Sequence, residues 1–315
     1  GFSDFSARSF PEGAIFDITG MSAFPEDDDY EYLLGLFNTN VMLGFMGIIN
    51  PTFHFQAGDM ARVPLKRGSF EQINAVKDLV RSAVKIAKLD WDKFELSHEF
   101  KLEHYKPGLV KAQFEEVIES ERDLVDELIS NEKELNRIFS TIYNLPLQSE
   151  KNLQPDLFCN FYEGAKWLIN KSRRAKVESL FSNFIGCIMG RYSLDQEGIV
   201  YAKSGNEGFK ELEAGDAYKT IPADDDGIVP LASEDWLFDD DATTRFKEFV
   251  KTVWGGEHLS ENLEFVSESL CLHALKPKKG ENAMDTIRRY FSTQFFKDHC
   301  KTYKKRPIYW LFSSG

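Results

Sequence analysis

Residues 109–143 read LVKAQFEEVIESERDLVDELISNEKELNRIFSTIY, and this stretch decides the expected architecture. Apolar residues recur along it at helical spacing, while charged residues fill the positions between them. That periodicity predicts one long amphipathic helix that buries one face against a neighbour. A second helical period begins at Ser69, so the two segments together predict a helical hairpin or coiled-coil-like spacer.

The predicted spacer lies between two regions of different pattern. Residues 1–70 alternate short apolar runs with turn residues, which predicts a small α/β specificity module with a strand over 14–18. Residues 151–315 predict a mostly helical, mixed C-terminal domain that ends in a strand over 308–312. With the helical spacer at 71–150, the predicted fold class is α+β and predominantly helical.

Shorter helices are expected where apolar periodicity and capping residues coincide. Asp27-Asp28-Asp29 precedes one of them, and a turn is expected at Gly58-Asp59. The predicted ranges are 30–37, 41–48, 156–189, 243–254, 261–270 and 282–303.

The charge of the chain is strongly polarised. The formal net charge is −13. Acids dominate residues 207–241, whereas Lys and Arg dominate residues 276–306. A protein polarised in this way can bind a polyanion on one face while staying acidic overall.

Within the basic region, residues 303–310 read YKKRPIYW, with three consecutive cations between aromatic residues. Such residues can hold phosphates and stack on planar groups. The alternative is a solvated basic turn that leads into a buried strand.

Cysteine and histidine spacing indicates no metal site. The four cysteines form no CxxC pair and the six histidines form no HExxH motif. Reduced thiols in a cytoplasmic protein are the simplest interpretation. No signal peptide is recognisable, and the apolar stretch near 41–49 is too short to span a bilayer. We expect a cytoplasmic protein without a membrane partner, and an excised fragment because it begins at Gly1 without Met.

Three short motifs suggest chemistry, each with a structural alternative. Asn50-Pro51-Thr52-Phe53 is similar to the Asn-Pro-Pro-Tyr/Phe loop of amino-methyltransferases, but Thr52 replaces the second proline and no Gly-rich loop lies nearby, so a turn or contact loop is favoured. Asp156, Glu163 and Lys166 have a spacing one residue too long for a nuclease signature. Asp224-Asp225-Asp226-Gly227 lacks the alternating acids of a calcium loop and predicts an exposed acidic turn.

Several segments together resemble one family of large adenine-specific DNA methyltransferases from phage-defence systems, the PglX family of BREX systems. They occur here in the family's order and span nearly the whole chain. The segments are FPEGAIFDITG (10–20), LFNT (36–39), NPTFHFQAGDM (50–60), GRYSLD (190–195), DGIVPL (226–231) and YKKRPIYW (303–310).

The resemblance implies a parent protein that methylates adenine N6 with S-adenosylmethionine in a short DNA site. It covers the family's C-terminal half, so the catalytic half and the cofactor loop are expected to be missing and the fragment to be inactive alone. No catalytic, cofactor-binding or metal residue is assigned here. The implied partners are double-stranded DNA, the missing catalytic half and other BREX proteins.

DNA recognition requires Lys and Arg on the phosphates and a few polar side chains on base edges. The residues expected to contact DNA are Arg8, Ser9, Gln56, Arg62, Lys66, Arg67, Arg173, Arg174, Lys304, Lys305 and Arg306. The main alternative is a scaffold for BREX proteins that docks through the acidic 207–241 region. A third alternative is a self-contained nuclease or methyltransferase with unrecognised motifs.

Overall fold

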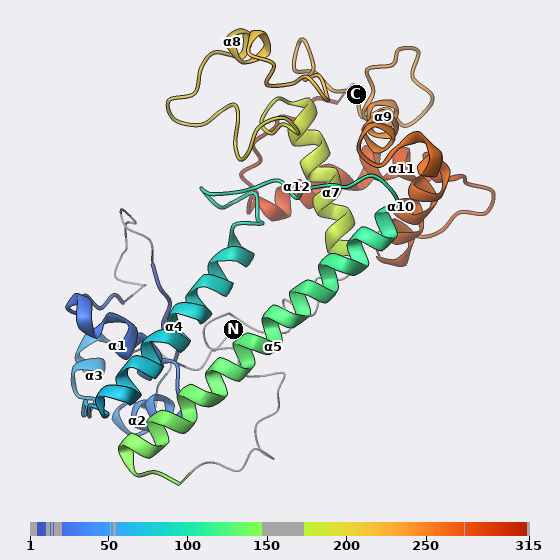
Figure 1. The fold of residues 1–315 in the computed structure, drawn as a ribbon. Coiled ribbons are helices and arrows are strands. Elements are labelled where there is room, and N and C mark those ends of the chain that lie inside the picture. Colours follow the sequence, from blue (N-terminus) through green and yellow to red (C-terminus); the bar gives the residue numbers. More distant parts are fainter. Residues whose placement is uncertain are drawn as a thin grey trace. The chain divides into compact units, whose positions relative to one another are not determined.

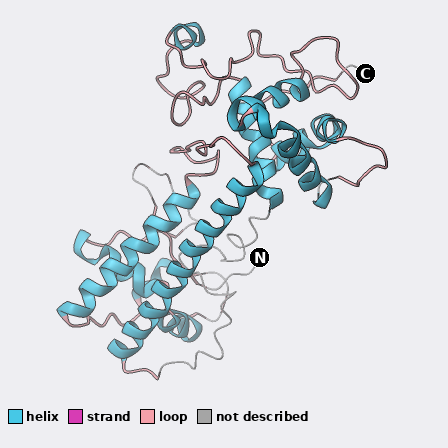
Figure 2. Cartoon of the chain, turned by 45° about the vertical axis from the view of Figure 1, so that its right-hand side comes forward, coloured by secondary structure: helices cyan, strands magenta, loops and turns pink. Residues whose placement is uncertain are grey.

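The computed structural model describes residues 5–10, 13, 15, 21–50, 52, 55–146, 173–273 and 275–313. All regular secondary structure in these ranges is helical (Figure 2). The chain divides into two compact units, described separately below. The N-terminal unit comprises Gly1–Asp90 and Ser120–Asn170, and the C-terminal unit comprises Trp91–Glu119 and Lys171–Gly315.

The N-terminal unit is built on two long helices, α4 (Phe70–Trp91) and α5 (Val110–Tyr143), of which α5 continues into the C-terminal unit (Figure 1). Both were predicted from their periodicity, and both are confirmed. Their apolar stripes meet in one buried core. Three shorter helices pack with them or beside them: α1 (Tyr30–Phe37), α2 (Asn40–Ile49) and α3 (Ala57–Ala61).

Close packing in this unit depends on Gly35 of α1. A Cβ at Gly35 would lie 3.0 Å from Val76 Cγ1 and 3.0 Å from Val80 Cγ2, both on α4. Contacts that short are tighter than ordinary packing contacts, so the Val76 and Val80 side chains would have to shift. Tyr32 and Phe139 fill the neighbouring space, with ring centroids 5.2 Å apart.

The C-terminal unit packs its helices around an aromatic core that is rich in phenylalanine. Phe181 and Phe246 stack with centroids 4.6 Å apart, and Phe291 meets Phe181 edge-on at 5.0 Å. The helices are α7 (Arg173–Ile188), α8 (Phe209–Ala214), α9 (Ala242–Trp254), α10 (Leu259–His273), α11 (Ala283–Tyr290) and α12 (Phe296–Thr302).

The helix predicted over 282–303 is present but not continuous. A π-helical turn, Phe291–Phe295, separates α11 from α12. Phe291 at the start of this turn and Phe295 at its end both lie in the buried core. The predicted helix over 156–189 is observed as α7, and its earlier part lies outside the described residues.

The β part of the predicted fold class is not confirmed. The strand expected over 308–312 is wrong, because these residues form bends and coil, with Trp310 and Phe312 each 88% exposed. A strand needs a paired neighbour, and the described residues offer no sheet edge to it. Most of the strand expected over 14–18 lies outside the described residues. The expected turn at Gly58-Asp59 is the short helix α3.

In the described part of the chain, no single helix has the length and apolar composition needed to cross a membrane. The helices α1 and α2 meet that test only as a pair, by length and composition, with a bend of 72° between them.

Candidate nucleic-acid interface

In the N-terminal unit, two predicted contact segments lie at the start of α1. The Tyr30 hydroxyl donates to Ser9 Oγ at 2.6 Å, and Arg67 Nη2 donates to both carboxylate oxygens of Asp29 at 2.7 and 2.5 Å. Arg8 is exposed beside Ser9. The structure therefore brings Arg8, Ser9 and Arg67 to one place, although Arg67 is paired with an acid.

The backbone around Lys66 is fixed by two tyrosines. Tyr32 donates its hydroxyl to Lys66 O at 2.7 Å, and Tyr143 accepts from Lys66 N–H at 3.1 Å while donating to Pro64 O at 2.8 Å. The Lys66 side chain is exposed and forms no ion pair with any described residue. A rigid backbone thus presents a free cation.

Gln56 and Arg62 flank α3. The Gln56 side chain and the Asp59 carboxylate form a reciprocal capping box, in which the Gln56 amide oxygen accepts from the Asp59 N–H. Asn50 donates to Asp59 Oδ2 at 2.7 Å, and this bond together with the Gln56 N–H lowers the pKa of the Asp59 carboxyl. Arg62 is exposed.

These contacts also bear on the methyltransferase-like motif. Asn50 Oδ1 accepts from Thr52 N–H at 3.0 Å, so both ends of the Asn50 amide serve a local turn. A target amine would need those same atoms. The geometry favours the contact-loop interpretation, while Pro51 and Phe53 lie outside the described residues.

Arg173 packs against α10 of the C-terminal unit and is half-buried. Its guanidinium lies 4.1 Å from the ring centroid of Phe265, and Nε donates to Ser269 Oγ at 2.6 Å. Glu268 lies 3.2 Å from Nη2. This arrangement ties α7 to α10 and leaves few donors for a ligand. The side chain of Arg174 lies outside what the structure describes.

The three consecutive cations form an exposed turn after α12, hereafter the basic turn (Lys304–Arg306). Lys304 and Lys305 have φ values of 49° and 65°, the left-handed region that side chains with a Cβ rarely adopt. Lys305 N–H donates to Cys300 O at 2.7 Å, which caps the helix. The three side chains are exposed and form no ion pair with any described residue.

His299 on α12 anchors both ends of this turn. Its ring lies 4.8 Å from that of Tyr303 and stacks on Tyr309 at 4.9 Å with 23° between the planes. Ile308 N–H donates to His299 Nε2 at 3.2 Å. Because a strained backbone persists only where its surroundings fix it, this buried histidine explains how the turn is maintained.

A polar cluster lies beneath the anchors and joins two of the resemblance segments. Arg191 Nε donates to the Tyr192 hydroxyl at 3.2 Å, and Tyr192 donates to Glu95 Oε2 at 3.4 Å. The other Glu95 oxygen accepts from Ser182 Oγ at 2.8 Å. Arg191 also interacts electrostatically with Tyr303 and Tyr309, which links the segment at 190–195 to the segment at 303–310. Sequence reasoning missed Glu95, which belongs to no motif.

Burial shifts the titration of this cluster. It raises the pKa of the Glu95 carboxyl and of the Tyr303 and Tyr309 hydroxyls. Burial, with the Arg191 charge as a further cause, lowers the pKa of His299 to about 4. Neutral His299 can accept the Ile308 N–H, which a protonated ring could not.

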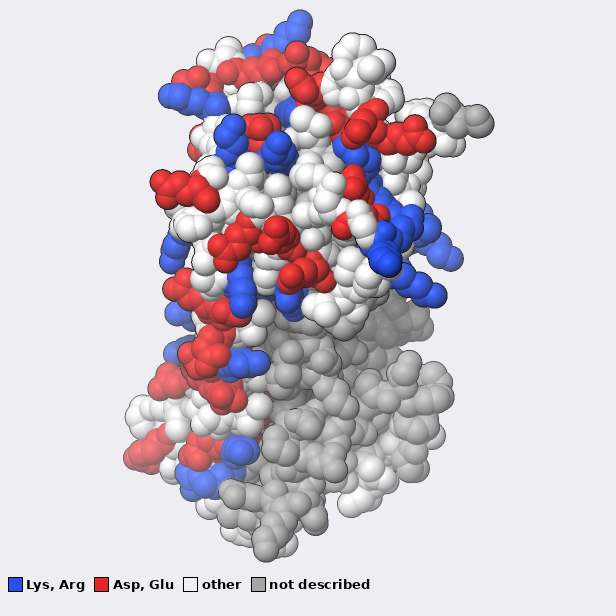
Figure 3. Space-filling view, turned by 90° about the vertical axis from the view of Figure 1, so that its right-hand side faces the viewer, with Lys and Arg blue, Asp and Glu red and all other residues white. Residues whose placement is uncertain are grey.

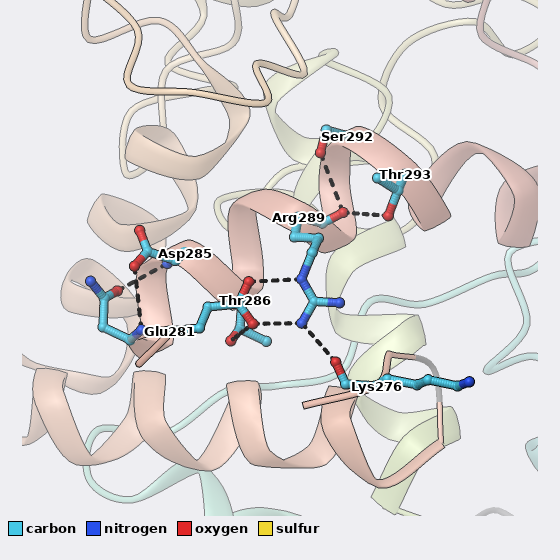
Figure 4. A network of polar contacts seen from close by, with 8 residues as sticks. Lys276, Glu281, Asp285, Thr286, Arg289, Ser292 and Thr293 are labelled. Atoms are coloured by element: carbon cyan, nitrogen blue, oxygen red, sulfur yellow. Dashed lines mark hydrogen bonds and ion pairs between the residues drawn. The ribbon is translucent and has the colours of Figure 1, made fainter. Parts of the chain in front are cut away.

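Some cations of the 276–306 region already pair with acidic side chains and are not free to contact phosphates. Arg289 grips both carboxylate oxygens of Glu281 at 2.7 and 2.5 Å and donates to Lys276 O at 3.1 Å, which closes the loop before α11 (Figure 4). This raises the pKa of Arg289 and lowers that of Glu281. Arg288 and Lys301 also pair with aspartates. On the face in Figure 3, acidic and basic side chains are interspersed over the described part of the chain.

The remaining motifs are accounted for locally or lie outside the described residues. In the 224–227 turn, Asp224 accepts from Ile228 N–H at 3.2 Å and lies 3.6 Å from Arg245 Nη1. Asp225 and Asp226 are exposed, as predicted, whereas the Asp224 side chain is mostly buried. Among the described residues, no group of three His, Cys, Asp or Glu side chains could hold a metal. The nuclease-like Asp156, Glu163 and Lys166 are not described.

A cleft of about 370 Å³ with mixed polar and apolar lining opens at the end of the 190–195 segment. Several polar residues that line the cleft pair with one another. Lys101 Nζ lies 3.0 Å from Glu197 Oε2, and Thr220 N–H donates to Asp195 Oδ2 at 2.8 Å. The described residues contain no strand followed by a Gly-rich turn, the arrangement that holds the phosphates of dinucleotide cofactors in α/β folds.

Comparison with known proteins gives two close matches. The chain is 45% identical over 324 residues to the adenine-specific methyltransferase BrxX of Escherichia coli O9:H4 (strain HS). It is 34% identical over 323 residues to the adenine-specific methyltransferase PglX of Lacticaseibacillus casei (strain Zhang). Each match covers 99% of this chain. No family model matches.

The resemblance to BREX adenine-specific methyltransferases is thereby confirmed. Its extent is smaller than expected: the chain spans about a quarter of the length of these relatives, 26% and 25%, and not half.

Proposed function

We propose that this chain is the DNA-recognition portion of an S-adenosylmethionine-dependent, adenine-N6-specific DNA methyltransferase of a BREX phage-defence system. The observation that carries the proposal is the similarity over 99% of the chain to a quarter-length part of two adenine-specific methyltransferases. In this proposal the methyl donor and the catalytic residues belong to the remaining three quarters of the parent protein, outside this chain. The chain alone then binds DNA without methylating it, in the cytoplasm.

The basic turn supplies contacts to the DNA backbone. Lys304, Lys305 and Arg306 are adjacent and exposed, and no described acid neutralises them. Cations of this kind position a duplex without reading its sequence. The polar cluster around Glu95 and His299 holds the turn in place, so its role is positioning.

The N-terminal unit supplies the specificity contacts. Arg8, Ser9 and Arg67 lie together near the start of α1, and Lys66 sits on a backbone fixed by Tyr32 and Tyr143. Sequence reading needs rigidly held polar side chains at base edges. Gln56 and Arg62 at α3 form a second group of this kind. In this proposal the module at 1–70 carries the specificity contacts, the C-terminal domain carries the backbone contacts of the basic turn, and the helical spacer connects them.

The proposal is tested by binding of the 315-residue chain to duplex DNA at several salt concentrations. Replacing Lys304, Lys305 and Arg306 with Ala should make the slope of log affinity against log salt shallower by about 2.7, because each lost phosphate contact contributes about 0.9. The matched control replaces Lys203, Lys210 and Lys219, which are exposed cations near the acidic region. Absence of duplex binding at low salt would refute DNA recognition.

A protein scaffold is the second candidate function. It is favoured by Trp236, Leu237 and Phe238, which are exposed within an acidic segment. Docking of other BREX proteins on this segment would bury them. Tight binding of a purified BREX protein that is lost in Leu237→Ala, together with no DNA binding, would favour the scaffold.

A further inference from the structure

The tripeptide Trp-Leu-Phe occurs twice in the C-terminal unit, and both copies are exposed. In the first copy Trp236, Leu237 and Phe238 are 47%, 93% and 65% exposed. In the second copy, residues 310–312, the values are 88%, 52% and 88%. Consecutive exposed side chains of this size mark interaction sites more often than single ones do.

The two copies have opposite electrostatic surroundings. The acidic segment (residues 234–241) encloses the first copy with Glu and Asp, and Trp236 Nε1 donates to Asp240 Oδ1 at 2.9 Å. The basic segment (residues 304–312) carries the basic turn and the second copy. The first surrounding repels a polyanion and the second attracts one.

The basic segment presents its aromatic rings from a fixed base. Tyr309 packs on His299 and against the aromatic core, and Trp310 follows directly. Neither Trp310 nor Phe312 makes a ring contact with a described residue, so their faces are free. Trp310 is four residues from Arg306, at most about 14 Å along the chain, so one short stretch of a strand can reach both.

We propose that the basic segment binds unstacked nucleotides, with Lys304, Lys305 and Arg306 on the phosphates and Trp310 and Phe312 stacking on exposed base faces. Aromatic rings stack on bases only where the base faces are free, as in single strands or beside an extruded base. This inference rests on the proposed DNA-recognition function and adds the kind of DNA that the segment engages. A protein partner would also bury the rings, but it gives no preference for single strands.

The test compares a fluorescein-labelled 12-mer single strand with the duplex of the same sequence, both titrated with the full chain. Trp310→Ala with Phe312→Ala should weaken single-strand binding by about 5- to 140-fold per lost stack and leave duplex binding within about twofold. Trp310→Phe with Phe312→Tyr keeps aromatic faces and should restore most of the affinity. The matched control is Trp236→Ala with Phe238→Ala, which should change neither affinity.

Tryptophan fluorescence gives an independent readout. Quenching by the single strand should fall in Trp310→Phe and persist in Trp236→Phe. The inference would be overturned if alanine substitutions in the two Trp-Leu-Phe copies weakened single-strand binding equally. It would also be overturned if the Trp310 and Phe312 substitutions weakened duplex and single-strand binding equally. In both cases, binding of the duplex by the unchanged chain would still support the proposed function. A chain that binds neither form of DNA would overturn both.

Discussion

The acidic and basic segments contain the same tripeptide, yet they are held by different means. The acidic segment rests on surface contacts: Arg288 Nη2 lies 2.7 Å from Asp235, whose side chain is 92% exposed. The basic segment is anchored by Tyr303 and Tyr309 on buried His299. The comparison shows that exposure of a tripeptide says little about its rigidity, which depends on what its neighbours bury.

The largest expected difference concerns the anchor of the basic segment. Tyr309→Ala should lower the free energy of unfolding by about 3 kcal/mol, because a ring that packs on His299 and the core is lost. Leu237→Ala, in the acidic segment, should change it by less than about 0.5 kcal/mol. Urea denaturation followed by circular dichroism measures both.

A second substitution separates the contribution of the Tyr309 ring from that of its hydroxyl. The hydroxyl is buried and has no hydrogen-bond partner among the described residues. Tyr309→Phe should therefore keep stability or raise it slightly, since an unsatisfied polar group is removed. A loss as large as that of Tyr309→Ala would show that the hydroxyl, and not the ring, anchors the segment.

Acid should loosen the basic segment and not the acidic one. The pKa of His299 is about 4 in the folded chain, below the ordinary value of 6.5. Between these pH values the unfolded chain binds a proton that the folded chain does not, so stability falls as pH drops from 6.5 to 4, by up to about 3 kcal/mol.

The measurement is urea denaturation at pH 7 and at pH 4.5, with His299→Phe as control because it keeps an aromatic ring without titrating. Glu95 contributes with the opposite sign, because its pKa is raised, so only the difference between the two proteins isolates His299. An identical pH dependence in both would contradict the assignment. Arg191, Tyr303 and Tyr309 are the charged and titratable groups that face the ring.

Changing the charge of the acidic segment should make it resemble the basic one. Glu234→Lys with Asp239→Lys should raise single-strand affinity by about fivefold at low salt and steepen the salt dependence by about 1.4, the contribution of two phosphate contacts. The same change combined with Trp236→Ala tests whether stacking takes part. Unchanged affinity would mean that charge is not what separates the two segments.

The smallest expected effect concerns the surface ion pair. Asp235→Asn should cost about 0.5 kcal/mol or less, since exposed pairs are screened and Asp285 still lies 3.6 Å from Arg288 Nη1. Thermal unfolding at low and high salt checks this. A loss well above 1 kcal/mol would indicate that the acidic segment is anchored as firmly as the basic one.

Much of the helical architecture could be predicted from local pattern. The helices over 30–37, 70–91 and 110–143 follow from apolar periodicity, because each buries one continuous stripe. The terminal strand could not be excluded in this way. Residues 308–312 have strand-forming side chains, but strand formation depends on a partner edge that sequence does not reveal.

For the candidate interface, sequence named Lys304, Lys305 and Arg306 but could not separate them from Arg173. Both sets are cations, and only packing showed that Arg173 lies against Phe265 while the basic turn is exposed. No sequence motif identified Glu95, because a single acid in a loop forms none. Only the tertiary structure shows that its carboxylate accepts a hydrogen bond from Tyr192.

The sequence by itself determined the helical periods, the opposed charges of the two Trp-Leu-Phe segments and the resemblance to adenine-specific methyltransferases. These are properties of residue order, which short-range physics and comparison can read. The tertiary structure decided which cations are free and that His299 anchors the basic turn. Those facts depend on burial and long-range contacts, such as Glu95 with Tyr192, that join residues far apart in the chain.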